Sequence, residues 1–221
     1  MQPSNLGAVI FDMDGVIVDS EPRHERAYLE VARAIGYGHN HGLRFADYIG
    51  RSDTELWVDF VKRNHPAQTL DELLAMKRAR VIDILRREEP VFEGVPERVR
   101  TLAAICPLAL ASGSERQVVE AVLSLKELGL YLTAIVSGSD VKRGKPAPDI
   151  FLRAAELLKV PPADCWVVED SKHGIAAAKA AGMRVIAITN TYPAAELQNA
   201  EHVATNYAEI GALFSQLLCE T

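Results

Sequence analysis

Residues 8–16 read Ala-Val-Ile-Phe-Asp-Met-Asp-Gly-Val, and they indicate the class of fold. Its four apolar residues, 8–11, predict a short strand, because a parallel strand covered by helices on both faces shows an unbroken apolar run. Two aspartates, Asp12 and Asp14, follow this strand at once, and Gly15 then allows a tight turn. In doubly wound sheets, ligands bind at the carboxyl ends of the strands. The stretch therefore predicts an α/β protein with a polar site after its first strand.

The rest of the chain repeats this alternation of short apolar runs and amphipathic segments. We expect further strands at residues 108–111, 134–137, 166–168 and 185–188, and helices near 97–105, 115–128, 148–158 and 173–181. Such alternation is typical of a doubly wound parallel sheet with a Rossmann-like order.

Residues 20–90 interrupt this rhythm, since they contain no strand signal and three or four helical stripes, such as Leu56, Trp57 and Phe60. We therefore expect an inserted helical domain at 20–90 and an α/β core domain made of residues 1–19 and 91–221.

Composition excludes several classes of protein. The 221 residues are 48% hydrophobic and 24% charged, as in ordinary globular proteins, which excludes global disorder. A net charge of −6 argues against nucleic acid as a partner, and no apolar run is long enough to cross a membrane. The three cysteines show no disulfide or metal-binding pattern, and the N-terminus shows no secretory signal. We expect a cytoplasmic protein that is a monomer or a weak homodimer.

Four of the predicted strand ends carry reactive side chains. They are Asp12 and Asp14, then Ser112 and Gly113, then Lys145, then Glu169 and Asp170. Four carboxyl groups in one crevice would repel one another, and an oxygen-rich set without histidine or sulfur suits Mg²⁺. A lysine and a hydroxyl beside this cation would face an anion. The set predicts phosphoryl transfer, in which one aspartate attacks phosphorus and the other handles the proton.

In order and spacing, these motifs resemble those of the haloacid dehalogenase superfamily of aspartate-nucleophile phosphatases. The resemblance covers nearly the whole chain, including a helical cap inserted after the first motif. It implies that Asp12 is the nucleophile and Asp14 the general acid and base. It also implies that Asp12, the Asp14 carbonyl and Asp170 hold Mg²⁺ with Glu169 close by, while the loop of Ser112 and Gly113 binds phosphate together with Lys145.

Within the superfamily, the chain looks most similar to the β-phosphoglucomutase and sugar-phosphatase branch. The segments Asp19-Ser-Glu-Pro-Arg-His24 and Lys-Pro-Ala-Pro-Asp-Ile-Phe at 145–151 carry this likeness. It implies substrate contacts from the cap by His24 and Lys77, with Arg51 and Arg116 as further candidates. Two positions depart from the mutase: Asp53 stands where it has a phosphate-gripping arginine, and Arg116 where it has an asparagine.

We therefore expect a Mg²⁺-dependent phosphatase that acts on a small phosphorylated metabolite, such as a sugar phosphate. A mutase that returns the phosphate to another hydroxyl of the same sugar is the first alternative, and the two departures count against it. A phospho-accepting signalling domain is the second. Simpler interpretations exist for single residues: the aspartates could be turn residues, Ser112 a helix cap, and His24 and Lys77 solvated side chains.

Overall fold

The computed structural model describes residues 6–38, 40–48 and 53–219, and the chain divides into two compact units. Unit 1 comprises Met1–Val18 and Val91–Thr221, and unit 2 comprises Asp19–Pro90. Each unit has its own hydrophobic core.

Unit 1 is built on a six-stranded parallel sheet with the order β3-β2-β1-β4-β5-β6. Its strands are β1 (Ala8–Phe11), β2 (Leu108–Ala111), β3 (Ala134–Val136), β4 (Cys165–Glu169), β5 (Arg184–Ile188) and β6 (His202–Ala204). Every residue of β1, β2 and β4 is buried, which explains why all their residues except Glu169, at the end of β4, are apolar. The predicted doubly wound sheet is confirmed. Strand β6 was not predicted, because its three residues are too short to show a pattern.

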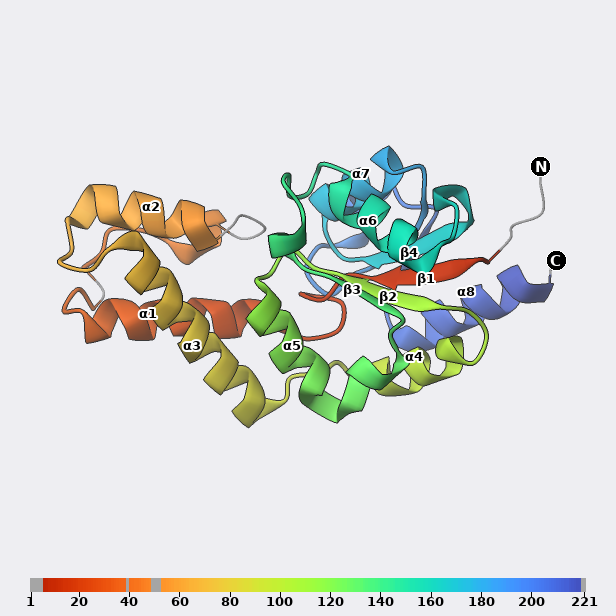
Figure 1. The fold of residues 1–221 in the computed structure, drawn as a ribbon, viewed down its shortest axis with the longest axis horizontal. Coiled ribbons are helices and arrows are strands. Elements are labelled where there is room, and N and C mark those ends of the chain that lie inside the picture. Colours follow the sequence, from red (N-terminus) through yellow and green to blue (C-terminus); the bar gives the residue numbers. More distant parts are fainter. Residues whose placement is uncertain (1–5, 39, 49–52, 220–221) are drawn as a thin grey trace. The chain divides into compact units, whose positions relative to one another are not determined.

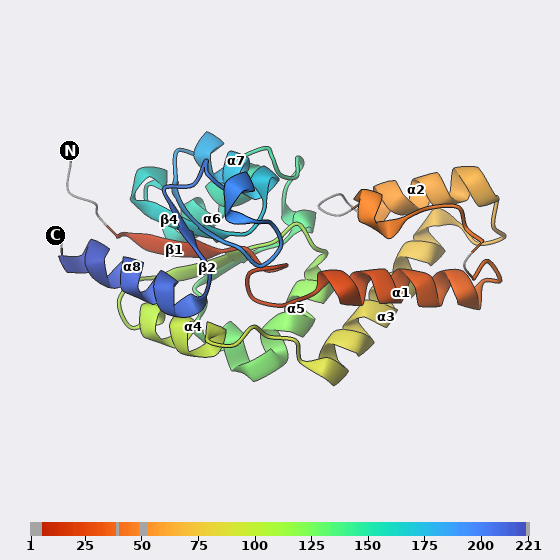
Figure 2. The same cartoon turned by 180° about the vertical axis from the view of Figure 1, so that it is seen from behind.

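Helices cover both faces of this sheet. Helices α6 (Asp149–Leu158) and α7 (Lys172–Ala180) lie on one face, whereas α4 (Val95–Ala103) and α8 (Tyr207–Cys219) lie on the other (Figure 1 and Figure 2). The helix predicted over 115–128 is shorter: α5 spans Arg116–Ser124, and a 3-10 segment, Leu125–Tyr131, follows. Leu125 and Leu128 are both buried in that segment, so their spacing imitated one more helical turn.

Unit 2 contains α1 (Glu21–Ala34), a 3-10 turn (Phe45–Tyr48), α2 (Asp53–Asn64) and α3 (Leu70–Glu88). Tyr28, Trp57 and Phe60 are completely buried at the centre of its core, with ring centroids 5.0 to 6.3 Å apart. Helix α3 begins with a capping box, in which Thr69 and Glu72 exchange side-chain and backbone hydrogen bonds. Among the residues described, no helix is both long and apolar enough to cross a membrane.

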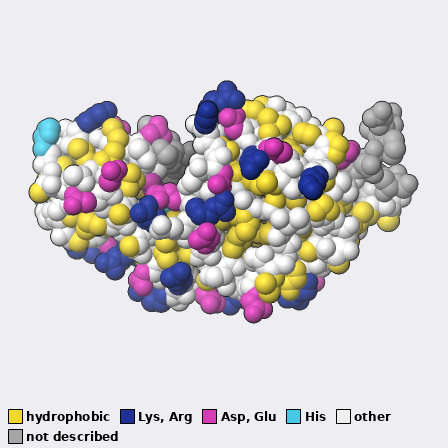
Figure 3. Space-filling model, in the orientation of Figure 1, with side chains coloured by type: hydrophobic (Ala, Val, Ile, Leu, Met, Phe, Trp, Pro, Cys, Tyr) yellow, Lys and Arg dark blue, Asp and Glu magenta, His cyan; other side chains and the backbone are white. Residues whose placement is uncertain are grey.

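On the face of the molecule drawn in Figure 3, basic and acidic side chains are interspersed rather than gathered by sign. A surface of mixed sign produces no extended field of one charge.

Candidate active site

The sheet topology brings two predicted motifs side by side. Strands β1 and β4 are neighbours at the point where the strand order reverses, which is where doubly wound sheets bind ligands. Phe11 pairs with Val168, and the backbone N–H of Asp12 donates to the carbonyl of Val168 at 3.0 Å. Asp12 therefore lies next to Glu169 and Asp170, which end β4 and follow it.

These three side chains form a buried carboxylate cluster. Asp12, Glu169 and Asp170 expose 6%, 0% and 4% of their surface, and each offers an oxygen within 4.8 Å of the others. Lys145 neutralises part of this charge, because its Nζ lies 2.6 Å from Oδ1 of Asp12 and 2.6 Å from Oε1 of Glu169. The ring of Phe151 lies 5.0 Å from the same nitrogen.

Burial dominates the electrostatics of the cluster. It raises the pKa of Asp12 to about 7, because the charge of Lys145 only partly offsets the loss of water and the repulsion from Glu169. The pKa of Asp170 is also well above its usual value, first through burial and then through the charge of Glu169. Three oxygen-donating groups with one ammonium among them fit a hard divalent cation such as Mg²⁺.

Glu169 has little freedom to move within the cluster. Its Oε2 accepts the backbone N–H groups of Asp170 and Ser171, both at 2.8 Å, and the Ser171 hydroxyl at 2.9 Å. Position 174 has no side chain to displace it: a Cβ built on Gly174 would lie 1.6 Å from Oε1 of Glu169. The carboxylate is thus held so that Oε1 faces Lys145.

Asp14 lies near enough for its charge to raise the pKa of Asp12, but its side chain contacts hydroxyl groups. The sequence grouped four carboxyl groups, and the structure brings three together and turns the side chain of Asp14 towards hydroxyls. Its Oδ2 accepts the Ser112 hydroxyl at 3.2 Å and the Ser114 hydroxyl at 2.8 Å. Directly after Asp14 the chain turns at Gly15, whose φ of +77° lies in the left-handed region that favours glycine.

The loop after β2 faces Asp14. Ser112 is completely buried, and its Oγ accepts the backbone N–H of Ser114 at 3.0 Å. Apart from its two chain neighbours, none of the residues described has a heavy atom within 4 Å of a Cβ built on Gly113, so the space beside this backbone is open. The N-cap of α5 is Glu115, so Ser112 shapes the loop rather than capping the helix.

The candidate cap residues have different surroundings. In unit 2, Lys77 is only 1% exposed, and its Nζ contacts Nδ1 of His24 and lies 2.5 Å from Oδ2 of Asp53. Arg116 does not belong to the helical unit at all. It begins α5 in unit 1, where it pairs with Asp140 at 2.5 Å. Arg51 lies outside the described residues.

Three further side chains near this site were not predicted. Thr191 donates its hydroxyl to Oδ2 of Asp170, Asn190 donates to the carbonyl of Gly15 at 2.8 Å, and Tyr207 donates to a carbonyl of the same turn. A signal existed for the first two, since they follow the predicted fifth strand and its carboxyl end shares the edge of the sheet where the motifs lie. Tyr207 gave no comparable signal.

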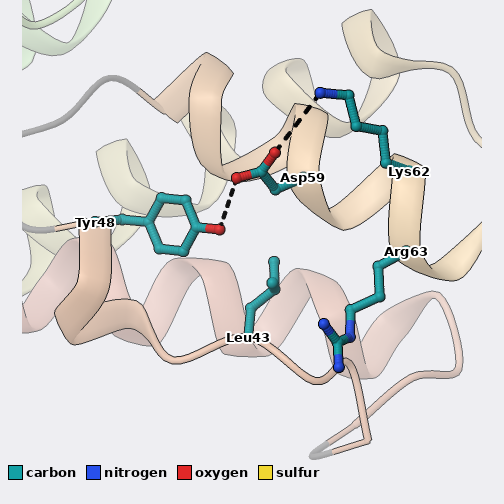
Figure 4. A pocket seen from close by; sticks show the side chains of 5 residues that line it. All are labelled: Leu43, Tyr48, Asp59, Lys62 and Arg63. Atoms are coloured by element: carbon teal, nitrogen blue, oxygen red, sulfur yellow. Dashed lines mark hydrogen bonds and ion pairs between the residues drawn. The ribbon is translucent and has the colours of Figure 1, made fainter.

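Unit 2 contains a pocket of about 440 Å³, shown in Figure 4. It is lined by Leu43, Tyr48, Asp59, Lys62 and Arg63, and the Tyr48 hydroxyl donates to Asp59 at 2.9 Å. None of these residues belongs to the predicted motifs.

Comparison with known proteins identifies the family. The model of the haloacid dehalogenase-like hydrolases matches residues 6–182. Hexitol phosphatase B of Escherichia coli (strain K12) is 35% identical over 205 residues, covering 89% of this chain and 88% of that protein. Fructose-1-phosphate phosphatase YqaB of the same organism is 34% identical, covering 80% of this chain and 94% of its own.

A solved structure shares the fold. CbbY from Rhodobacter sphaeroides, in complex with xylulose-(1,5)bisphosphate, aligns with a TM-score of 0.81 at 24% identity, covering 93% of this chain and 96% of that chain. This likeness concerns the fold alone. Together with the match over residues 6–182, the buried carboxylates and their partner Lys145 show that the chain belongs to the haloacid dehalogenase-like hydrolase family.

Proposed function

We propose that this chain is a Mg²⁺-dependent phosphatase that hydrolyses small phosphorylated carbohydrates through an aspartyl phosphate on Asp12. The observation that carries the proposal is that two aspartates, only two residues apart, have different surroundings. Asp12 lies in the buried cluster against Lys145, whereas Asp14 faces the hydroxyls of Ser112 and Ser114. Two relatives named for hexitol and fructose 1-phosphate phosphatase activity support the choice of substrate class.

The metal ligands are part of this proposal. Asp12, Asp170 and the backbone carbonyl of Asp14 would hold Mg²⁺, with Glu169 close by. When bound, the cation supplies positive charge against the carboxylates and the phosphate oxygens.

In the first half of the reaction, a carboxylate oxygen of Asp12 attacks phosphorus. The new Asp12 O–P bond forms as the bond from phosphorus to the sugar oxygen breaks, and Asp14 donates a proton to that leaving oxygen. Lys145, the Ser112 hydroxyl and the backbone N–H of Gly113 would bind the phosphate oxygens and align them for attack.

In the second half, Asp14 takes a proton from a water molecule. The water oxygen attacks phosphorus, the Asp12 O–P bond breaks, and the electron pair returns to the carboxylate of Asp12. The products are the free sugar and inorganic phosphate, and the enzyme returns to its starting state.

The two units would have separate tasks. Residues 1–19 and 91–221 would carry the chemistry, and residues 20–90 would act as the cap that selects small substrates, with His24 and Lys77 contributing to the selection. We also propose a cytoplasmic protein that is a monomer or a weak homodimer. The location agrees with the free, buried thiols of Cys106 and Cys165.

The test is phosphate release from a panel that includes hexitol phosphates, fructose 1-phosphate, phosphoglycolate and an aryl phosphate, in MgCl₂ or in EDTA. We expect Mg²⁺-dependent release for one or two sugar phosphates. Asp12→Asn should abolish it, whereas Asp83→Asn, at an exposed site on α3, should not change it. Turnover by Asp12→Asn at the wild-type rate would exclude the covalent route.

Other outcomes point to the alternative functions. Isomerisation of a sugar phosphate with little phosphate release would indicate the mutase. Stable labelling of Asp12 by a phosphodonor without turnover would indicate a signalling domain.

A further inference from the structure

Three side chains from the C-terminal part of unit 1 converge on the turn that follows β1. Asn190 and Thr191 follow β5, and Tyr207 is the first residue of α8. All three lie beyond residue 182, where the match to the family model ends. We call this set the C-terminal clamp.

Two members of the clamp hold the backbone of the turn. Three successive N–H groups, at residues 16–18, all point to the carbonyl of Met13, at 2.7 to 3.2 Å. The carbonyls of Gly15 and Val16 are bound from outside the turn. The Asn190 side chain donates to the Gly15 carbonyl at 2.8 Å, and the Tyr207 hydroxyl donates to the Val16 carbonyl. Side chains more than 170 residues away in the chain therefore bind successive carbonyls directly after Asp14.

The third member, Thr191, connects the turn to the carboxylate cluster. Its hydroxyl donates to Oδ2 of Asp170. A Cβ built on Gly15 would lie 1.9 Å from that same oxygen and 2.7 Å from the Thr191 hydroxyl. The backbone at Gly15 thus packs against the carboxylate and the hydroxyl with no room for a side chain between them.

We propose that Asn190, Thr191 and Tyr207 are positioning residues that fix the turn carrying Asp14 and the carboxylate of Asp170 in one common geometry. The inference rests on the proposed function, which assigns proton transfer to Asp14 and metal binding to Asp170. None of the three clamp side chains needs to touch the substrate. Thr191 acts on the metal site through Asp170, and Asn190 and Tyr207 act on Asp14 through its turn.

The different exposure of the clamp residues makes it possible to test a positioning role apart from a role in packing the fold. Asn190 and Thr191 are exposed, so their substitution should affect folding little. Tyr207 is buried, with its ring centroid 6.4 Å from that of Phe92. Tyr207→Phe keeps this ring and removes only the hydroxyl.

The first experiment measures Mg²⁺ binding by titration calorimetry with MgCl₂, which requires no turnover. Thr191→Val keeps the shape of the side chain and removes the donor to Asp170, so we expect the Kd for Mg²⁺ to rise about 10- to 100-fold. Thr191→Ser keeps the donor and should remain within about threefold of the wild type. The melting temperature without metal should change by no more than about 2 °C. Equal Mg²⁺ affinity in the valine variant and the wild type would overturn the role of Thr191.

The second experiment measures kcat and KM at saturating MgCl₂, well below the melting temperature. Tyr207→Phe and Asn190→Ala should each lower kcat about tenfold with KM within about twofold, because a displaced Asp14 impairs proton transfer and leaves phosphate binding intact. An unchanged kcat in both variants would overturn the role of the clamp at the turn. If the wild type releases no phosphate, the proposed function fails, and the calorimetric comparison still decides on Thr191.

Discussion

The carboxylate of Glu169 occupies the space that a side chain at position 174 would need. Gly174→Ala therefore tests how rigidly Glu169 is held in the carboxylate cluster. A Cβ at position 174 would lie 1.6 Å from Oε1 and 1.9 Å from Cδ of Glu169. The backbone of α7 cannot move away without breaking its own hydrogen bonds. The carboxylate must therefore move by more than 1 Å to reach an ordinary van der Waals distance from the new Cβ.

The size of the expected destabilisation follows from the hydrogen bonds that Glu169 would lose in Gly174→Ala. It accepts Lys145 at 2.6 Å and the N–H groups of Asp170 and Ser171 at 2.8 Å. A hydrogen bond to a charged group contributes about 1.5–3 kcal/mol, and we expect the loss of about two of them. Alanine returns about 1 kcal/mol of helix propensity relative to glycine. The net loss of about 3 kcal/mol corresponds to a fall in melting temperature of roughly 10 °C for a chain of this size.

The assay is thermal unfolding in EDTA, followed by KM for the best sugar phosphate. KM should rise, because Lys145 loses one of its two carboxylate partners. The matched control is Gly211→Ala in α8, where the built Cβ would lie 2.2 Å from Cζ of Arg98. That guanidinium ends a flexible side chain and can turn away, so the control should differ from the wild type by about 1 kcal/mol or less. A Gly174→Ala variant as stable and active as the control would refute the idea that Glu169 is held rigidly.

Three further predictions concern charge. Burial raises the pKa of Asp12 to about 7, above its ordinary value of 3.8, so the folded state binds more protons than the unfolded state between about pH 4 and 7. In EDTA, the stability that Asp12 contributes to the folded protein therefore falls as pH rises through that window. MgCl₂ should then raise the melting temperature more at pH 8 than at pH 5. Equal increases at the two pH values would contradict this prediction. For Asp140, bonds from Ser137 and Arg116 outweigh burial and lower the pKa to about 2, so its contribution is present above about pH 4 and is lost as pH falls towards 2. The difference in melting temperature between the wild type and Asp140→Asn should thus shrink between pH 5 and pH 3, and a constant difference would refute the pairing. Finally, Lys77→Met in unit 2 leaves Asp53 without its buried ammonium and should destabilise the protein by about 1–3 kcal/mol in urea unfolding, whereas Lys62→Met, on an exposed ion pair, should have almost no effect.

The sequence alone was sufficient to predict the strands that position the site. β1, β2 and β4 are buried on both faces, so each contains a continuous apolar run that is visible in the sequence. The residue after each apolar run lies at the carboxyl end of a parallel strand, so the sequence alone assigns Asp12, Ser112 and Glu169 to one edge of the sheet. The family resemblance rests on the same residues.

Short or marginal elements escaped sequence analysis. Strand β6 has three residues, and the helix expected over 115–128 ends at Ser124, although the spacing of Leu125 and Leu128 imitated a further turn. In both cases the local pattern fits more than one structure, and packing in the tertiary fold decides between them.

The partner of each charged group depends on the tertiary fold and is not visible in the sequence. Lys145 lies 133 residues from Asp12 and pairs with it, Asp14 turns towards Ser112 across 98 residues, and Arg116 pairs with Asp140. Residue type and spacing determine which groups reach the edge of the sheet. The direction of each side chain depends on the desolvation and hydrogen bonds that it meets there, and these come from segments remote in the sequence.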